Sequence, residues 1–220
     1  GFVTEKTNND YVTVNSFVVP ATTSASVQRG IDASASGWTV NVADGTYNGD
    51  IDINKPISVV GSSTAAIIRG LYAGSANTVF ISSSNASIKK VTVTRDFGAD
   101  LTAWYACTKN QGISLAQTTT GIVIENVLLT GNRNAIFVNN AQNVTITKCT
   151  IENNRTGIHF GNDFSGAEVH NNFIRNNYLC GTNGLYGVLP FDGDSVFQII
   201  GFLMMETPNR FLRNIFLFQK

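Results

Sequence analysis

The sequence has little charge and no excess of either sign. Only 14% of its 220 residues are charged, and the 15 Lys and Arg side chains equal the 15 Asp and Glu side chains in number. No overall field therefore attracts nucleic acid or an anionic membrane, although a local patch could still hold a polyanion. The hydrophobic content of 43% is enough for a sizeable core, so a largely disordered chain is not expected.

Cysteines and unbroken hydrophobic runs are also scarce. Cys107, Cys149 and Cys180 are odd in number and match no CxxC or Cys/His metal spacing, and Cys149 is expected to be a buried free thiol. The longest apolar region, residues 196–218, is interrupted by polar side chains and a proline, so no membrane span is expected. The first residues show no signal-peptide pattern.

The abundant residues are Asn, Ser, Thr, Gly and Val. This composition favours short strands joined by polar turns over helices rich in Glu, Lys and Leu. The sequence therefore predicts an all-β protein.

One short apolar rhythm occurs three times, in residues 121–138, 143–160 and, less closely, 166–181. Ile124 recurs as Ile146 and then as Val169, at steps of 22 and 23 residues. A repeat of this length with alternating apolar positions is typical of a solenoid, whose coils bury their apolar faces on one another. We expect the strands of successive coils to pair in parallel, about 4.8 Å apart, with equivalent side chains in columns.

Asparagines break each copy of the repeat at the same point. Asn132, Asn154 and Asn177 fall in one column. Asparagine tolerates left-handed backbone geometry, and its amide can form hydrogen bonds along a stack. We therefore predict a structural ladder of these side chains.

The repeat also predicts the domain boundaries. Ile113 matches Ile136 and Ile158, which leaves residues 96–111 as a loop insertion between coils. Ile199 and Phe211 match Ile146 and Ile158 by spacing, so further coils are expected in residues 188–220. The result is one solenoid of residues 24–220, preceded by an extended segment of residues 1–23.

Residues 24–37 are expected to form a short capping helix. Ser24 or Ser26 would be its N-cap, Val27 and Ile31 share one face, and Gly37 would end it. Such a helix would cover the first coil and prevent its strand edges from pairing with another chain.

Two stretches resemble a known family. Residues 26–61, SVQRGIDASASGWTVNVADGTYNGDIDINKPISVVG, are similar to the opening of right-handed parallel β-helix proteins of the pectin-lyase-like superfamily, and residues 144–160, VTITKCTIENNRTGIHF, are similar to their coil. The resemblance implies a right-handed parallel β-helix that contacts polysaccharide or a cell-surface glycan along one flank, outside the cell or on a cell or virion surface. Because such scaffolds host lyases, glycosidases, adhesins and proteins without chemistry, it leaves the activity open.

No catalytic residue is assigned from the sequence. A lyase of this shape needs a base and a neutralising group such as Ca²⁺ held by several acids, and a glycosidase needs two carboxylates. The acids are scattered here, and the paired aspartates with Gly-His-Gly and the Asp-Pro-His-Asp motif are missing. No cofactor is therefore expected, and Ca²⁺ has no ligand cluster to support it.

The insertion supplies most of the predicted substrate-binding residues. It combines aromatic and charged side chains on a rigid scaffold, where binding residues concentrate, namely Asp96, Trp104, Tyr105 and Lys109. Aromatic faces stack on sugars, but an alternative is that Trp104 and Tyr105 pack back onto the coil.

Arg133 and Arg155 complete the predicted binding residues. They occupy one column beside the asparagine ladder, where two guanidinium groups would suit the carboxylates or sulfates of an acidic polymer. The alternative is that both are solvated turn residues. His159 should face outward, and His170 lies near a different strand, so no histidine pair is expected.

Three functions remain open: a polysaccharide lyase or glycosidase-like enzyme, a glycan-binding or adhesion protein, and a self-assembling surface protein. The third interpretation follows from the end of the sequence, where NIFLFQK is expected to begin a new coil without a polar cap. An uncapped coil could join copies into an oligomer or an end-to-end filament.

Overall fold

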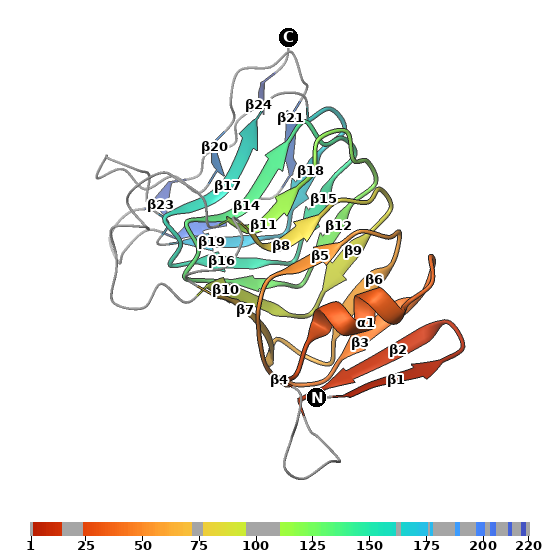
Figure 1. Ribbon diagram of the computed structural model, residues 1–220. Helices are drawn as coiled ribbons and strands as arrows, with labels where there is room; N and C mark the ends of the chain where they lie inside the picture. Colours follow the sequence, from red (N-terminus) through yellow and green to blue (C-terminus); the bar gives the residue numbers. More distant parts are fainter. Residues whose placement is uncertain are drawn as a thin grey trace.

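The computed structural model describes residues 2–14, 24–71, 77–95, 111–161, 164–175 and 177, together with the backbone of five short strands beyond residue 187. The described strands form three sheets, and successive turns of the chain stack on one another along a common axis (Figure 1). Most strand pairs are parallel, so the predicted all-β parallel β-helix is confirmed.

The three sheets are named A, B and C here. Sheet A consists, in order, of β1 (Phe2–Lys6), β2 (Asn9–Thr13), β3 (Thr39–Val42), β6 (Ser58–Gly61), β9 (Ser87–Lys89), β12 (Val123–Glu125), β15 (Thr145–Thr147), β18 (Glu168–His170), β21 (Phe197–Ile200) and β24 (Leu217–Phe218). Sheet B consists of β23 (Phe211–Leu212), β22 (Leu203–Met205), β19 (Phe173–Arg175), β16 (Thr150–Glu152), β13 (Leu128–Leu129), β10 (Thr92–Arg95), β7 (Ala66–Gly70) and β4 (Gly45–Asn48). Sheet C consists of β20 (Val188–Leu189), β17 (Thr156–Gly161), β14 (Asn134–Asn139), β11 (Gln111–Leu115), β8 (Asn77–Ile81) and β5 (Ile51–Ile53).

The core is a set of stacked apolar columns between the three sheets. In sheet A, Ile124 is in register with Ile146, and Ile146 with Val169, and each is at most 1% exposed. This confirms the column predicted from the repeat. Cys149 is a buried free thiol, as expected, and burial raises its pKa to about 12.

The predicted asparagine ladder is present. The side-chain nitrogen of Asn132 donates to Oδ1 of Asn154 at 3.0 Å, and that of Asn154 donates to Oδ1 of Asn177 at 3.1 Å. Each acceptor oxygen also receives the backbone N–H of the asparagine one coil earlier, at 2.9 and 3.0 Å. Gly131 and Asn153, which precede ladder residues, have left-handed φ values of 69° and 56°. The ladder therefore provides hydrogen-bond partners for buried backbone N–H groups at a turn where the preceding residue has a left-handed backbone conformation.

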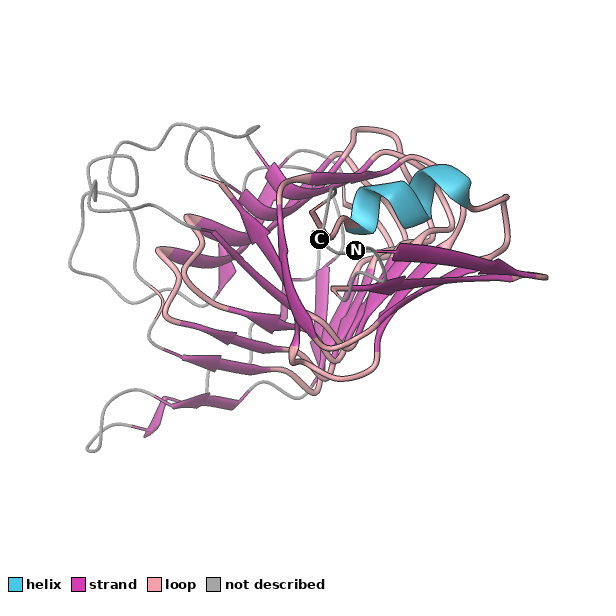
Figure 2. Cartoon of the chain, turned by 60° about the horizontal axis from the view of Figure 1, so that its bottom comes forward, coloured by secondary structure: helices cyan, strands magenta, loops and turns pink. Residues whose placement is uncertain are grey.

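The N-terminal end is covered by α1 (Val27–Ala33), which lies against β2 and β5 (Figure 1, Figure 2). Ser26 is its N-cap, and Lys55 donates to three carbonyl oxygens at its C-terminal end, those of Ile31, Asp32 and Ser34. A Cβ at Gly30 would come within 2.5 Å of Val12, so only glycine allows helix and sheet to approach this closely. Residues 2–13 form an antiparallel hairpin, β1–β2, whose second strand extends sheet A beside β3.

The C-terminal strands follow the prediction in part. Ile199 is in register with Val169 and so continues the column of Ile146, as expected, and in sheet C Val188 is in register with Ile158. Phe211 lies in β23, which runs antiparallel to β22, and β24 runs antiparallel to β21. The expectation that NIFLFQK begins a new parallel coil is therefore wrong, because the chain reverses direction and pairs with its own preceding strands.

We predict that Asn154→Ala lowers the free energy of unfolding by about 3 kcal/mol, because three backbone groups, the N–H of Asn132 and the carbonyl oxygens of Leu129 and Glu152, lose a buried hydrogen bond to the side chain. The measurement is urea unfolding followed by circular dichroism. Asn153→Gly is the matched control: Asn153 is the exposed neighbour, with a backbone angle that glycine adopts freely, and this change should stay within about 0.5 kcal/mol. Equal losses in the two variants would contradict a structural role for the ladder.

Candidate functional site

The ladder fixes the positions of the two predicted arginines. Arg133 follows Asn132 and precedes β14, and Arg155 follows Asn154 and precedes β17. The backbone N–H of Arg155 donates to the oxygen of Asn132 at 2.9 Å, and that of Thr156 donates to the oxygen of Arg133 at 2.8 Å. The arginines are thus equivalent residues of adjacent coils, as predicted. Since neighbouring residues of extended chain point to opposite sides, both lie on the outer side of sheet C.

Burial strongly affects both guanidinium groups. Arg155 is only 4% exposed, whereas Arg133 is partly exposed. Loss of solvation lowers the pKa of Arg133, and loss of solvation together with the charge of Arg133 lowers the pKa of Arg155 to about 10. The alternative of two solvated turn residues is therefore wrong for Arg155.

Two aromatic rings lie on the same outer face. Phe137 of β14 is in register with His159 of β17, and their ring centroids are 4.9 Å apart with a tilt of 41°. Burial lowers the pKa of His159, and the charges of Arg133 and Arg155 lower it further. The sequence predicted that His159 faces outward, but Phe137 was not among the predicted site residues. Because Phe137 and His159 are 22 residues apart, which is one coil, the repeat length could have identified them as neighbours.

The other four predicted binding residues cannot be placed relative to the arginines. Asp96, Trp104, Tyr105 and Lys109 lie outside the described residues, between Arg95 at the end of β10 and Gln111 at the start of β11. The second histidine, His170, lies in sheet A and not in sheet C, which agrees with the expectation that the histidines do not pair.

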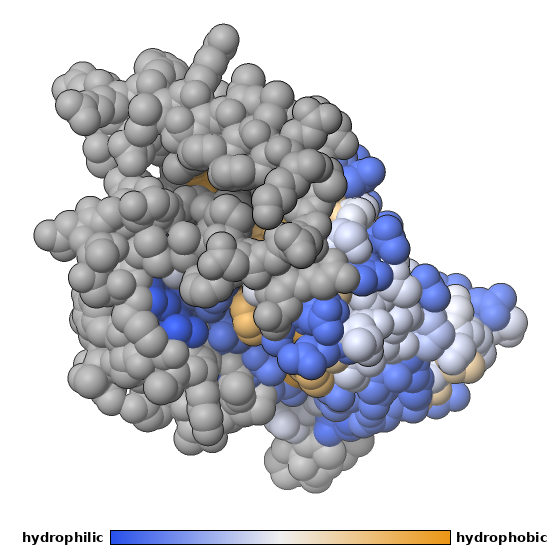
Figure 3. Space-filling view, turned by 90° about the horizontal axis from the view of Figure 1, so that it is seen from above, coloured by the Kyte–Doolittle hydropathy of each residue, from blue (hydrophilic) through white to orange (hydrophobic). Residues whose placement is uncertain are grey.

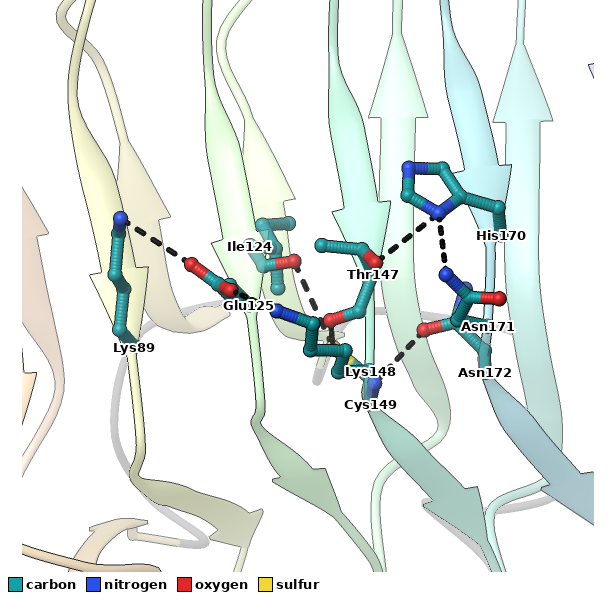
Figure 4. Close-up of polar contacts among 9 residues, drawn as sticks. All are labelled: Lys89, Ile124, Glu125, Thr147, Lys148, Cys149, His170, Asn171 and Asn172. Atoms are coloured by element: carbon teal, nitrogen blue, oxygen red, sulfur yellow. Dashed lines mark hydrogen bonds and ion pairs between the residues drawn. The ribbon is translucent and has the colours of Figure 1, made fainter.

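Sheet A carries a second polar group on its outer face (Figure 4). The carboxylate of Glu125 lies 3.3 Å from Nζ of Lys89 on one coil and 2.9 Å from Nζ of Lys148 on the other. Hydrogen bonds from Lys148 and then Lys89 lower the pKa of Glu125. In this row, unlike charges alternate from coil to coil and offset one another.

The same row continues to His170. Its Nδ1 lies 3.2 Å from Oγ1 of Thr147 and 3.0 Å from the side-chain nitrogen of Asn171 (Figure 4). Since an amide nitrogen only donates, Nδ1 is the acceptor in the second contact, which leaves Nε2 as the protonated nitrogen of the neutral ring. The sheet A row therefore contains two separate hydrogen-bonded groups, the ion pairs of Glu125 with Lys89 and Lys148 and the contacts of His170 with Thr147 and Asn171.

The described residues provide no evident metal site or membrane helix. Nowhere among them do three or more His, Cys, Asp or Glu side chains gather in a way that could hold a metal ion. In the same part of the chain, no helix is long and apolar enough to cross a membrane. Viewed from above, the described surface is mostly hydrophilic, with small hydrophobic areas (Figure 3).

Comparison with known proteins yields a family and a fold. A family model described as the right handed beta helix region matches residues 53–196, whereas a search of curated protein sequences found no match. Among solved structures, a pectin methylesterase mutant in complex with a hexasaccharide is 16% identical with a TM-score of 0.67, over 90% of this chain and 66% of that one. An alginate lyase from Paenibacillus sp. str. FPU-7 is 13% identical with a TM-score of 0.59, over 80% of this chain and 72% of that one. At these identities the likeness is one of fold.

We predict that Glu125→Gln destabilises the protein by less than about 1 kcal/mol near neutral pH, because the ion pairs are largely exposed and screened by salt. The pKa of Glu125 is below its ordinary value of 4.5, so its contribution is complete above that value and disappears as the pH falls through the folded-state pKa. Urea unfolding of both proteins, at neutral and strongly acidic pH, measures the difference. A difference that grew on acidification would contradict this assignment.

Proposed function

The chain belongs to the right-handed β-helix family, and we propose that it binds an acidic polysaccharide along the outer face of sheet C, beside Arg133 and Arg155. The observation that carries this proposal is that arginine occupies the same position on two adjacent coils, with the guanidinium groups close enough for the charge of one to act on the other. Guanidinium groups repeated from coil to coil offer paired donors to successive acid groups of a polymer.

The exposure of the side chains indicates how a ligand would lie. Arg133, Phe137 and His159 are partly exposed and would make the contacts, while Arg155 is buried and would add its positive charge from beneath. Coils repeat about every 4.8 Å, so a linear polymer parallel to the helix axis would meet equivalent groups in succession. The ring of Phe137 offers an apolar face to a sugar, and Arg133 offers paired donors to its carboxylate or sulfate.

The insertion is proposed to contribute further contacts. Its C-terminal end joins β11 at Gln111, which is in register with Asn134, the residue after Arg133. Asp96, Trp104, Tyr105 and Lys109 precede Gln111 in the sequence, and we retain them as proposed substrate-binding residues.

The structural neighbours support a carbohydrate ligand in general terms, since their names refer to pectin, a hexasaccharide and alginate. The chain spans 66% of the length of the first of them, so turnover by a lyase or glycosidase-like reaction is a separate proposal from binding. A location outside the cell or on a cell or virion surface follows from the same proposal, because that is where long polysaccharides are met.

Self-assembly without catalysis is the second proposal. The observation in its favour is β1, which forms an end of the sheet A strand order and, within the part of the chain that the structure describes, pairs on one side alone, with β2. Sedimentation at high protein concentration distinguishes it, because a filament-forming protein gives large species and a monomeric binder does not.

We expect Arg133→Gln to weaken binding of polygalacturonate or alginate about tenfold, the effect of losing one charge-assisted contact. Isothermal titration calorimetry measures the affinity, with neutral dextran as the ligand control. Lys90→Gln is the matched variant, since Lys90 is an exposed cation that directly follows β9 of sheet A and lies outside the proposed site. Assay of the same mixtures for new reducing ends and for unsaturated products tests turnover. Equal affinities in the wild type and Arg133→Gln, or no affinity for any acidic polymer, would overturn the proposal.

A further inference from the structure

The outer face of sheet C carries a column in which large rings and a small hydroxyl alternate. Ser114 of β11 is in register with Phe80 of β8 on one coil and with Phe137 of β14 on the next. The residue before each of these three is fully buried in the core, so all three side chains point outward. The strands are neighbours in Figure 1, and the two phenylalanines stand two coils apart, about 9.6 Å along the helix axis.

The column is accessible at its rings and polar at its centre. Phe80 and Phe137 are partly exposed, whereas Ser114 is 6% exposed and its side chain is too short to reach as far from the sheet as the rings do. Among the described residues, the hydroxyl of Ser114 has no hydrogen-bond partner. A polar group of a ligand that lay across the two rings would supply one.

The ring of Phe137 extends toward the following coil. It contacts the ring of His159 with centroids 4.9 Å apart, and a Cβ at Gly161 would lie 3.4 Å from Cε2 of Phe137 and 3.7 Å from Cζ. Because Gly161 has no side chain, the ring can occupy the space beside it. The ring is thus held by its neighbours on the next coil, which reduces the conformational entropy lost when a ligand packs on it.

We propose that Phe80, Ser114 and Phe137 form a sugar platform, the sheet C platform, which selects acidic polysaccharides whose sugars are joined through equatorial bonds, with one sugar over each coil. This inference rests on the proposed function and adds a determinant of linkage to it. Arg133, in the turn before β14, supplies the positive charge that attracts an acid group of the same chain.

The physical basis is a match between the repeat of the protein and that of the polymer. In a chain joined through equatorial bonds, each sugar advances by close to one coil spacing and is turned by about half a revolution from the one before. Alternate sugars then present the same side, and the rings of Phe80 and Phe137, on alternate coils, pack against two of them at once. In a chain joined through axial bonds, the sugar rings lie across the polymer axis, so their faces do not follow the column.

One end of the column is unfavourable for an acidic chain. Asp52 of β5 is in register with Phe80, and its carboxylate accepts a hydrogen bond from Ser82 at 2.6 Å. Its negative charge repels a carboxylate of the ligand, whereas Arg133 beside β14 attracts one. The charges therefore favour binding over the three coils from β8 to β14.

The test compares two polymers that carry one carboxylate per sugar and differ in linkage, polymannuronate with equatorial bonds and polyguluronate with axial bonds. Isothermal titration calorimetry at one pH and one salt concentration measures both affinities, because electrostatic attraction alone would make them similar. We expect the wild type to bind polymannuronate about tenfold more tightly. This comparison does not depend on a variant that must fold.

Phe80→Ala removes one ring of the sheet C platform and leaves Arg133 in place. We expect it to weaken binding of polymannuronate about tenfold, the effect of losing one packed aromatic side chain, and to weaken binding of polyguluronate much less. Tyr11→Ala is the matched control, since Tyr11 is an aromatic residue of β2 in sheet A that is 42% exposed and outside the platform. It should keep the preference of the wild type. Urea unfolding of both variants verifies that they fold.

The outcomes distinguish this inference from the proposed function. Similar affinities of the wild type for the two polymers, or a preference for polyguluronate, would overturn the sheet C platform and leave the proposed function standing where binding depends on Arg133. Folded Phe80→Ala that kept the preference for polymannuronate would do the same. Absence of binding to both polymers and to polygalacturonate would overturn both proposals.

Discussion

The structure depends on the exact repetition of one coil upon another. Parallel pairing brings equivalent backbone groups together, and the columns Ile124–Ile146–Val169 and Asn132–Asn154–Asn177 then serve two purposes. The first removes apolar surface from water, and the second supplies partners for polar backbone groups that the turn buries. Neither column is stable in a single coil, because each side chain finds its partner only in a neighbour.

The same repetition decides how charge is distributed on the surface. A side chain in one coil necessarily lies beside its equivalent in the next, so the order of residue types along a column fixes its electrostatics. The sheet A row alternates Lys89 and Glu125 with Lys148 nearby, and its charges offset one another. Arg133 and Arg155 repeat the same charge on adjacent coils, and each contributes to lowering the pKa of His159.

The sequence predicted the middle of the protein well and its C-terminal end in part, since Ile199 continues the sheet A column but the strands after β22 do not form a parallel coil. Between Ile124 and Val169 the copies are close enough in length that register follows from counting, and the columns, the ladder and the arginine pair were all identified in this way. Beyond Val188, spacing alone matched Phe211 to Ile158, but the chain reverses direction and β23 and β24 pair antiparallel. Periodicity carries no information about strand direction, which depends on the path of the connecting turns.

By itself the sequence determined the all-β class, the coil length, the N-terminal helix and the residues that share a column, because these follow from local spacing and side-chain alternation. Only the tertiary structure decided that Arg155 is buried, that Phe137 and His159 are in contact, and that Glu125 is held by lysines on two coils. These properties depend on how far side chains from neighbouring coils extend toward one another and on what excludes water around them. A linear pattern does not contain that information.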